Sequence, residues 1–247
     1  MEFEAYSHRN GLLVMAHDTD CLPLWNEIKD IIDNITEKDI INLHFTSYIN
    51  KQKSISMALN VLLKQRFMAN RWLKEPYIFN DSRYKNKNWR LDFAKEPISV
   101  EVAFNHSGSA AWNLMKPVIA SELNHVQKAV QSKIGVIICA MDEMRSVGGF
   151  DNAVGTYEKY IDYLKPLRVQ LTTPLVIIGL KKPTSFEIKT FKVSSNKTLG
   201  KIFLLPRNVE LKRITINGKY LVKNNYSSYQ GSLTPVLSMR MKYKRLL

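Results

Sequence analysis

Hydrophobic positions in the first part of the chain recur at three- and four-residue steps, the spacing of one face of a helix. From Leu24 to Ile35 this spacing predicts an amphipathic helix, whose stripe contains Trp25, Ile28, Ile31 and Ile32. A longer helix is predicted over Ser54–Trp72, and Pro76 helps to end it. The polar and basic stretch Asn80–Asn88 indicates a loop.

After that loop the period changes to that of strands. Arg90–Ala94 and Ile98–Phe104 are predicted as two strands, separated by a turn at Lys95–Pro97. Ile134–Ala140 and Leu175–Leu180 are short, continuous apolar runs, typical of strands covered on both faces.

Helical patterns separate these strands. They cover Ala110–Val130, where Pro117 suggests a kink, and Asp151–Leu164. The alternation of helices and strands predicts a mixed α/β layer architecture.

The last quarter of the chain consists of short basic segments with β character: Phe186–Val193, Lys201–Leu205, Arg213–Ile216 and Tyr220–Val222. Asn217-Gly218, between the last two, is a strong hairpin signal. We therefore expect a catalytic core over residues 1–180 and, in the same domain, a basic β-rich C-terminal extension over residues 181–247.

Charge separates the same two regions. Residues 181–247 contain 15 Lys and Arg against two acidic residues, a net +13 of the total +14, whereas residues 1–180 are nearly neutral. Such a field concentrates a polyanion at the surface; the alternative is a solvated basic face without a specific ligand. Near the end, basic and apolar residues alternate in a way that suits an arm facing phosphate or a disordered end, with the charges on Arg240, Lys242, Lys244 and Arg245.

Several classes of protein are excluded by composition. No apolar stretch is long enough to span a membrane, and the N-terminal residues lack the pattern of a signal peptide, so we expect a soluble, cytoplasmic protein. The two cysteines, Cys21 and Cys139, show neither zinc spacing nor a reason to pair. We expect no organic cofactor and no membrane partner.

Two carboxylates give the first indication of chemistry. If the strands on either side of Pro97 pair, Asp92 and Glu101 approach one another across the hairpin. Close carboxylates are best tolerated with a cation between them, and Mg²⁺ suits oxygen ligands. The alternative is two unrelated acids on exposed edges of a hairpin.

The segment around these carboxylates resembles the BglII/BstYI group of restriction endonucleases in the PD-(D/E)XK nuclease superfamily. The group's pattern Asp-Phe-x-Lys-x5-Glu-Val-Gln-Phe appears as Asp92–Lys95 and Glu101–Phe104 with the same spacing. Further similarity covers Tyr6–Leu12, Ser121–Leu123, Ser132–Ile134 and Pro174–Gly179. The resemblance extends over residues 5–180, with gaps, and does not clearly include the basic extension.

The resemblance implies a restriction-endonuclease-like fold, a mixed central sheet flanked by helices. It also implies a homodimeric, Mg²⁺-dependent type II enzyme that cuts double-stranded DNA at a short palindromic site and leaves 5′-phosphate ends. A palindrome shares the two-fold symmetry of such a dimer. The resemblance to this group also implies a GATC-centred site.

The resemblance also assigns roles. Asp92 is the main metal ligand, Glu101 holds the metal or its waters, and the backbone carbonyl of Val102 is a further ligand. Glu75 would lie near the metal-bound waters, although an ordinary surface glutamate is an equal alternative.

Ala103 departs from the pattern, because the group has Gln there and relatives have Lys or Glu. Three interpretations are open: an inactivated form of the family pattern, a role transferred to Lys95 or Lys116, or a metal-activated water that needs no such side chain. If the chain is a weakened form, Ala103→Gln should raise the cleavage rate.

Base reading is expected from two segments. Asn105, His106 and Ser107 directly follow the catalytic strand, where similar enzymes contact bases, although a polar turn is an equal alternative. The loop from Met141 to Asn152 matches a second reading segment of the group, and its candidates are Arg145, Ser146 and Asn152. Rival functions are a repair-type nuclease of the superfamily and a non-catalytic or catalytically impaired DNA-binding protein.

Overall fold

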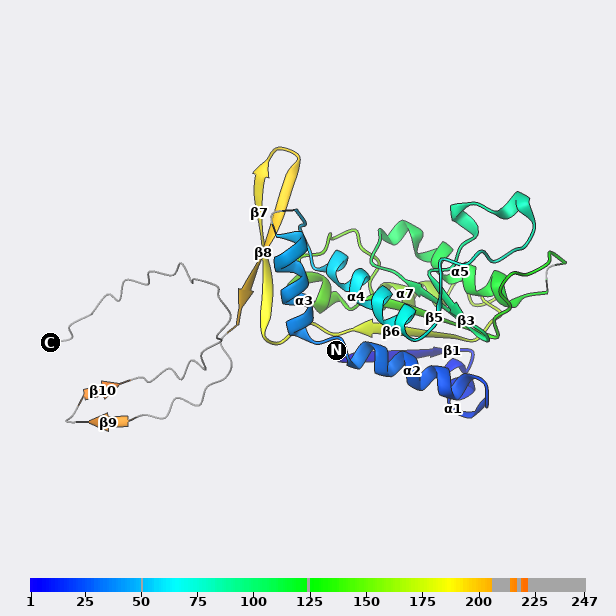
Figure 1. Cartoon of the computed structure of the whole chain (residues 1–247), viewed down its shortest axis with the longest axis horizontal. Helices are drawn as coiled ribbons and strands as arrows, with labels where there is room; N and C mark the ends of the chain where they lie inside the picture. The colour runs from blue at the N-terminus through cyan, green and yellow to red at the C-terminus, as the bar shows by residue number, and fades with distance from the viewer. Residues whose placement is uncertain (50, 124, 206–213, 217–218, 222–247) are drawn as a thin grey trace. The chain divides into compact units, whose positions relative to one another are not determined.

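The computed structural model describes residues 1–49, 51–123, 125–205, 214–216 and 219–221. Contacts divide the chain into two units, Met1–Leu205 and Pro206–Leu247. The first unit contains the layered α/β body (Figure 1). Within the described ranges, no helix has the length and apolar character required to cross a membrane.

A six-stranded mixed sheet forms the centre of the body, in the order β1-β6-β5-β4-β3-β2. The parallel strands β4, β5 and β6 lie in the middle, and the antiparallel strands β1, β3 and β2 complete the edges. Their bounds are β1 Phe3–His8, β2 Leu73–Lys74, β3 Phe93–Lys95, β4 Ile98–Val102, β5 Ile134–Ala140 and β6 Leu175–Leu180. The two apolar runs form β5 and β6 over the predicted residues.

Helices cover both faces of this sheet, so the predicted mixed α/β architecture is confirmed. One face packs against α1 (Gly11–His17), α2 (Cys21–Asp33), α3 (Glu37–Leu43) and α4 (Ser56–Ala69). The other packs against α5 (Ala110–Ser121) and α7 (Tyr157–Leu164). Successive residues of β5 serve opposite faces: Ile138 lies in the first core and Ile137 in the second. The short helix α6 (Asp142–Val147) follows β5, and single helical turns lie at His44–Tyr48, Ser82–Tyr84, Lys87–Trp89 and Ser107–Ser109.

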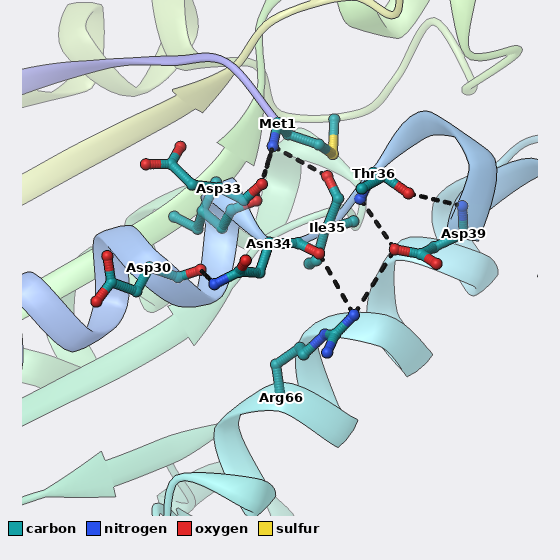
Figure 2. A network of polar contacts seen from close by, with 9 residues as sticks. Met1, Asp30, Asp33, Asn34, Ile35, Thr36, Asp39 and Arg66 are labelled. Carbon is teal, nitrogen blue, oxygen red and sulfur yellow. Dashed lines mark hydrogen bonds and ion pairs between the residues drawn. The ribbon is translucent and has the colours of Figure 1, made fainter.

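A polar network connects the elements on the first face (Figure 2). Thr36 begins α3 with a capping box, in which its hydroxyl accepts from the Asp39 N–H and the Asp39 carboxylate accepts from the Thr36 N–H. Arg66 of α4 lies 3.7 Å from Asp39 and donates to the Asn34 carbonyl at 3.3 Å. The Met1 ammonium donates to three carbonyls at the end of α2 and just after it, at 2.8, 3.2 and 2.9 Å. The network therefore fixes α2, α3 and α4 relative to β1.

Two of the predicted helices are too long. The helix predicted over Ala110–Val130 ends at Ser121, because the backbone of residues 127–129 pairs with residues 78–80 instead. The helix predicted from Asp151 begins at Tyr157, because Val154 forms a bridge with His106. Both errors come from long-range backbone pairing that the local apolar pattern does not reveal.

Three further predictions need correction. The first strand of the hairpin begins at Phe93, not Arg90. The loop predicted over Met141–Asn152 contains α6. Strand β1 and helices α1 and α3 were not predicted, because they are short and their apolar residues are few.

The basic extension begins with a two-stranded ribbon, β7 (Phe186–Ser194) and β8 (Lys197–Leu204), which extends beyond the layered body (Figure 1). Gly200 permits its close approach, because a Cβ there would lie 2.1 Å from the Lys53 carbonyl oxygen. In the second unit β9 (Ile214–Ile216) pairs antiparallel with β10 (Lys219–Leu221), as the Asn217-Gly218 signal predicts.

Candidate active site

The β3–β4 hairpin brings the two predicted carboxylates together. Phe93 pairs with Val100, so Asp92 and Glu101 lie opposite one another just beyond the paired residues. Oδ2 of Asp92 accepts a 2.7 Å hydrogen bond from the Val102 N–H, and the Asp92 N–H donates to Oε1 of Glu101 at 3.3 Å. These bonds fix both side chains to the backbone of the same hairpin.

Glu101 is buried in the protein interior next to Asp92, where it contacts a lysine. The residue is 1% exposed, and its Oε2 is in contact with the Nζ of Lys116 from α5. Lys116 also donates to the Arg90 carbonyl at 3.2 Å. Lys116 therefore connects α5 with the segment that leads into β3.

Burial changes the protonation of both acids. It raises the pKa of Glu101 to about 8, with the charge of Asp92 acting in the same direction and Lys116 in the opposite one. Burial also raises the pKa of Asp92, against the Val102 hydrogen bond and the charge of Lys116. The pair is thus an electrostatically costly arrangement that a nearby cation stabilises.

Asp92 lines a cleft of about 360 Å³ between α4 and the hairpin. The other residues of its lining are Asn60, Lys64, Lys74, Glu75, Phe93, Val102, Phe104 and Asn105. Glu75 lies at the rim, where its N–H donates to the Asp92 carbonyl at 2.9 Å and its carboxylate is within 3.7 Å of Arg90. The structure therefore gathers Asp92, Glu75 and the Val102 backbone around one open space.

Ala103 contributes no polar side chain to the cleft. Its side chain is 1% exposed and packs in the apolar core beneath α5 and α7. Lys95 points to a different part of the molecule, where its Nζ lies 2.9 Å from a Glu27 oxygen and from the Asn70 carbonyl. Of the two lysines suggested as substitutes for the side chain at position 103, Lys116 is the one that reaches Glu101.

Comparison with known proteins decides the family. Residues 3–180 match the model of the family described as restriction endonuclease BglII/BglIII. The chain belongs to this family. Its membership confirms the resemblance found in the sequence and makes the protein a type II site-specific deoxyribonuclease.

The fold of a solved DNA complex agrees with this assignment. A crystal structure of restriction endonuclease BglII complexed with a DNA 16-mer has a TM-score of 0.58 and 15% sequence identity, covering 83% of this chain and 100% of that chain. Free BglII shows a TM-score of 0.47 at 14% identity, with the same coverage of both chains. No curated protein matches the sequence.

In this member of the BglII/BglIII family, the first expected reading segment lies beside the carboxylates. Asn105 is exposed, lines the cleft, and accepts a 3.2 Å hydrogen bond from Asn113. His106 is also exposed, and its Nδ1 accepts from the Gly108 N–H. The Ser107 N–H donates to the Ala153 carbonyl at 2.7 Å, which joins this segment to residues 153–155.

The second expected reading segment is largely occupied by its own contacts. Arg145 lies 3.2 Å from Asp142 and donates to the Asn152 carbonyl at 3.4 Å. The Ser146 hydroxyl donates to the Asp142 carbonyl, and the side chain of Asn152 is exposed. The tail residues expected to contact phosphate lie outside the described residues; they are Arg240, Lys242, Lys244 and Arg245.

Three polar residues of the cleft were not predicted from the sequence. Asn60 and Lys64 lie one turn apart on α4, and Lys74 belongs to β2. The i, i+4 spacing of the first two residues indicates a shared helix face, but it does not indicate which surface the face meets.

The donors present fit a hard cation such as Mg²⁺. Among the described residues, no group of three or more His, Cys, Asp or Glu side chains is arranged around a metal position. Asp92, however, lines the cleft, and its Oδ1 has no hydrogen-bond partner in the described ranges. Mg²⁺ is commonly held by one or two carboxylates and keeps several waters, so Asp92 alone in the cleft meets the minimum of this requirement.

Proposed function

We propose that the protein is a Mg²⁺-dependent homodimeric restriction endonuclease. It hydrolyses both strands of DNA at a short palindromic site and leaves 5′-phosphate ends. The observation that carries this proposal is that Asp92, which lines an open cleft, is hydrogen-bonded to Glu101, which is buried against Lys116. Family membership supplies the class of reaction.

Asp92 and Glu101 would hold the ion, with the Val102 carbonyl as a further ligand and Glu75 near its waters. A bound Mg²⁺ ion would supply charge neutralisation at the scissile phosphate and a lower pKa for the attacking water. The hydrogen bond from Val102 to Asp92 keeps one carboxylate oxygen engaged and leaves the other directed to the ligand.

Lys116 replaces the polar side chain that the family pattern has at position 103. Its ammonium group is at the carboxylate that Ala103 cannot reach. We assign it a positioning role: it holds Glu101 in place and favours the ionised form of that carboxylate. This assignment favours an active enzyme over a chain that merely binds DNA.

The segment after β4 would recognise the DNA sequence. Asn105, His106 and Ser107 would read base edges from a fixed distance beyond Glu101. A two-fold dimer presents two such segments, one for each half of a palindrome. A GATC-centred site remains our specific proposal for the sequence.

The basic extension would bind phosphates. The β7–β8 ribbon has exposed lysines on both strands: Lys189, Lys192, Lys197 and Lys201. Such contacts contribute affinity without sequence preference.

Plasmid digestion with Mg²⁺ tests the proposal. Discrete fragments, followed by sequencing of their ends, would establish the site, the stagger and the 5′-phosphate. A smear would favour a repair-type nuclease, and intact DNA with a gel shift would favour a non-catalytic binding protein. The DNA-free oligomeric state, measured by light scattering, tests the dimer.

A further inference from the structure

Two lysines from different elements line the catalytic cleft. Lys64 comes from the third turn of α4 and Lys74 from β2, yet both line the cleft that contains Asp92. Lys74 lowers the pKa of the Lys64 amine, and both side chains line the same cleft. Two ammonium groups near one another repel unless a negative group is close to both.

The surrounding acids only partly supply that negative group. Glu75 lies 3.4 Å from Lys74, but the same carboxylate is also 3.7 Å from Arg90. One carboxylate oxygen of Asp92 is engaged with the backbone of the hairpin. Glu75 therefore lies between two cations, Lys74 and Arg90, and Lys64 adds a third positive charge to the lining of the same cleft.

We propose that Lys64 and Lys74 together bind one backbone phosphate of the DNA strand that lies in the cleft, and so position that strand against Asp92. This inference rests on the proposed nuclease function. A phosphodiester has two unesterified oxygens that share one negative charge, so it can accept from both ammonium groups at once. Asn60, one turn before Lys64 on α4, adds an amide to the same wall.

The position of the pair gives it a role distinct from that of the basic extension. The extension is a separate ribbon with its own lysines, whereas Lys64 and Lys74 lie in the cleft itself. Loss of the pair should therefore affect both the affinity for DNA and the rate at which a bound strand is cut. Loss of an unrelated surface lysine should affect neither property strongly.

The test compares the wild-type homodimer with Lys64→Gln, Lys74→Gln and the double variant. Lys165→Gln is the matched control, because Lys165 is an exposed lysine beyond α7 that is not part of the cleft. Binding of a short fluorescein-labelled duplex is measured by anisotropy with Ca²⁺ in place of Mg²⁺, between roughly 50 and 200 mM salt.

Each single cleft variant should bind roughly tenfold more weakly, the value of a charge-assisted hydrogen bond. The log–log salt slope should flatten by about 0.9 when the phosphate contact is lost. Because both lysines hold the same phosphate, the double variant should lose much less than the product of the two single losses. Single-turnover cleavage with saturating enzyme should also slow in all three cleft variants.

Two outcomes would overturn the inference. Unchanged affinity and slope in the double variant would mean that the lysines are only solvated, and fully multiplicative losses would mean separate phosphates. Both results presuppose a wild-type protein that binds and cuts DNA. If the wild-type protein itself neither binds nor cuts DNA, the proposed function fails first, so the two failures are distinguishable.

Discussion

The ammonium group of Lys116 is in contact with the carboxylate of Glu101, and both side chains are buried. The first comes from a helix and the second from the catalytic strand, 15 residues apart. Removing one partner of a buried ion pair leaves the other charge without compensation, which typically costs about 3–5 kcal/mol. This pair therefore couples the stability of the fold to the chemistry of the site.

Lys116→Met should lower the free energy of unfolding by about 3–5 kcal/mol and slow single-turnover cleavage by on the order of 10²-fold or more. Adding Glu101→Gln should restore much of the stability, because the unpaired charge is removed, but not the activity. Urea unfolding and cleavage assays measure the two effects. A Lys116→Met enzyme that remains folded and cuts at the wild-type rate would refute the positioning role.

Asp92→Asn should abolish cleavage and leave DNA binding in Ca²⁺ largely intact, because the group is proposed to hold the metal and not to read bases. Asp162→Asn, an exposed carboxylate on α7, is the control and should cut normally. Plasmid digestion and anisotropy binding measure both properties. Wild-type cutting by the Asp92 variant would remove the proposed active site.

Ala103→Gln should lower the unfolding free energy by about 1–3 kcal/mol, because position 103 is enclosed in a close-packed apolar core. The sequence pattern alone favours a gain in rate for this variant if the enzyme is a weakened family member. With Lys116 already at Glu101, we expect no gain. Thermal unfolding and single-turnover kinetics decide, and faster cleavage would show that Lys116 does not replace the missing side chain.

His44 should make stability fall on acidification. Burial lowers its pKa below the ordinary 6.5, against a smaller effect of the Gly200 backbone, and neither ring nitrogen makes a well-formed hydrogen bond within the described ranges. The unfolded chain then binds the proton more readily, so stability is full above pH 6.5 and is lost as the pH falls through the folded pKa. His44→Phe should reduce this loss relative to wild type, whereas the same substitution at exposed His17 should not. Chemical unfolding between pH 5 and 8 measures it, and equal acid sensitivity in wild type and His44→Phe would contradict the assignment.

The extent to which sequence predicted the structure depends on how local each signal is. Strands β5 and β6 were predicted residue by residue, because a strand buried on both faces must be apolar throughout. The helix predicted to Val130 was too long, because Val126 and Val130 have helical spacing but serve a small core beside Phe79. The sequence contains no sign of that partner, which lies about fifty residues earlier.

In the candidate active site, too, local sequence signals were found and contacts made by tertiary packing were not. Asp92 and Glu101 were found because one tight hairpin brings them together, and a hairpin is local. Lys116 was one of two candidates, and only the packing of α5 against β4 distinguishes it from Lys95. Lys64 and Lys74 were missed because α4 reaches the cleft through tertiary packing alone.

The strand β4 also limits how this enzyme can be re-engineered. Asn105 lies four positions after Glu101, and an extended chain of that length spans roughly 13 Å. If Asn105–Ser107 read bases as proposed, an insertion there would displace the carboxylates along with the reading residues. Asp151 and Asn152 are exposed and precede the Ala153 carbonyl that Ser107 contacts, so they belong to a different segment. Libraries that seek new target sequences should therefore vary this second segment, because its length can change while the catalytic strand keeps its place.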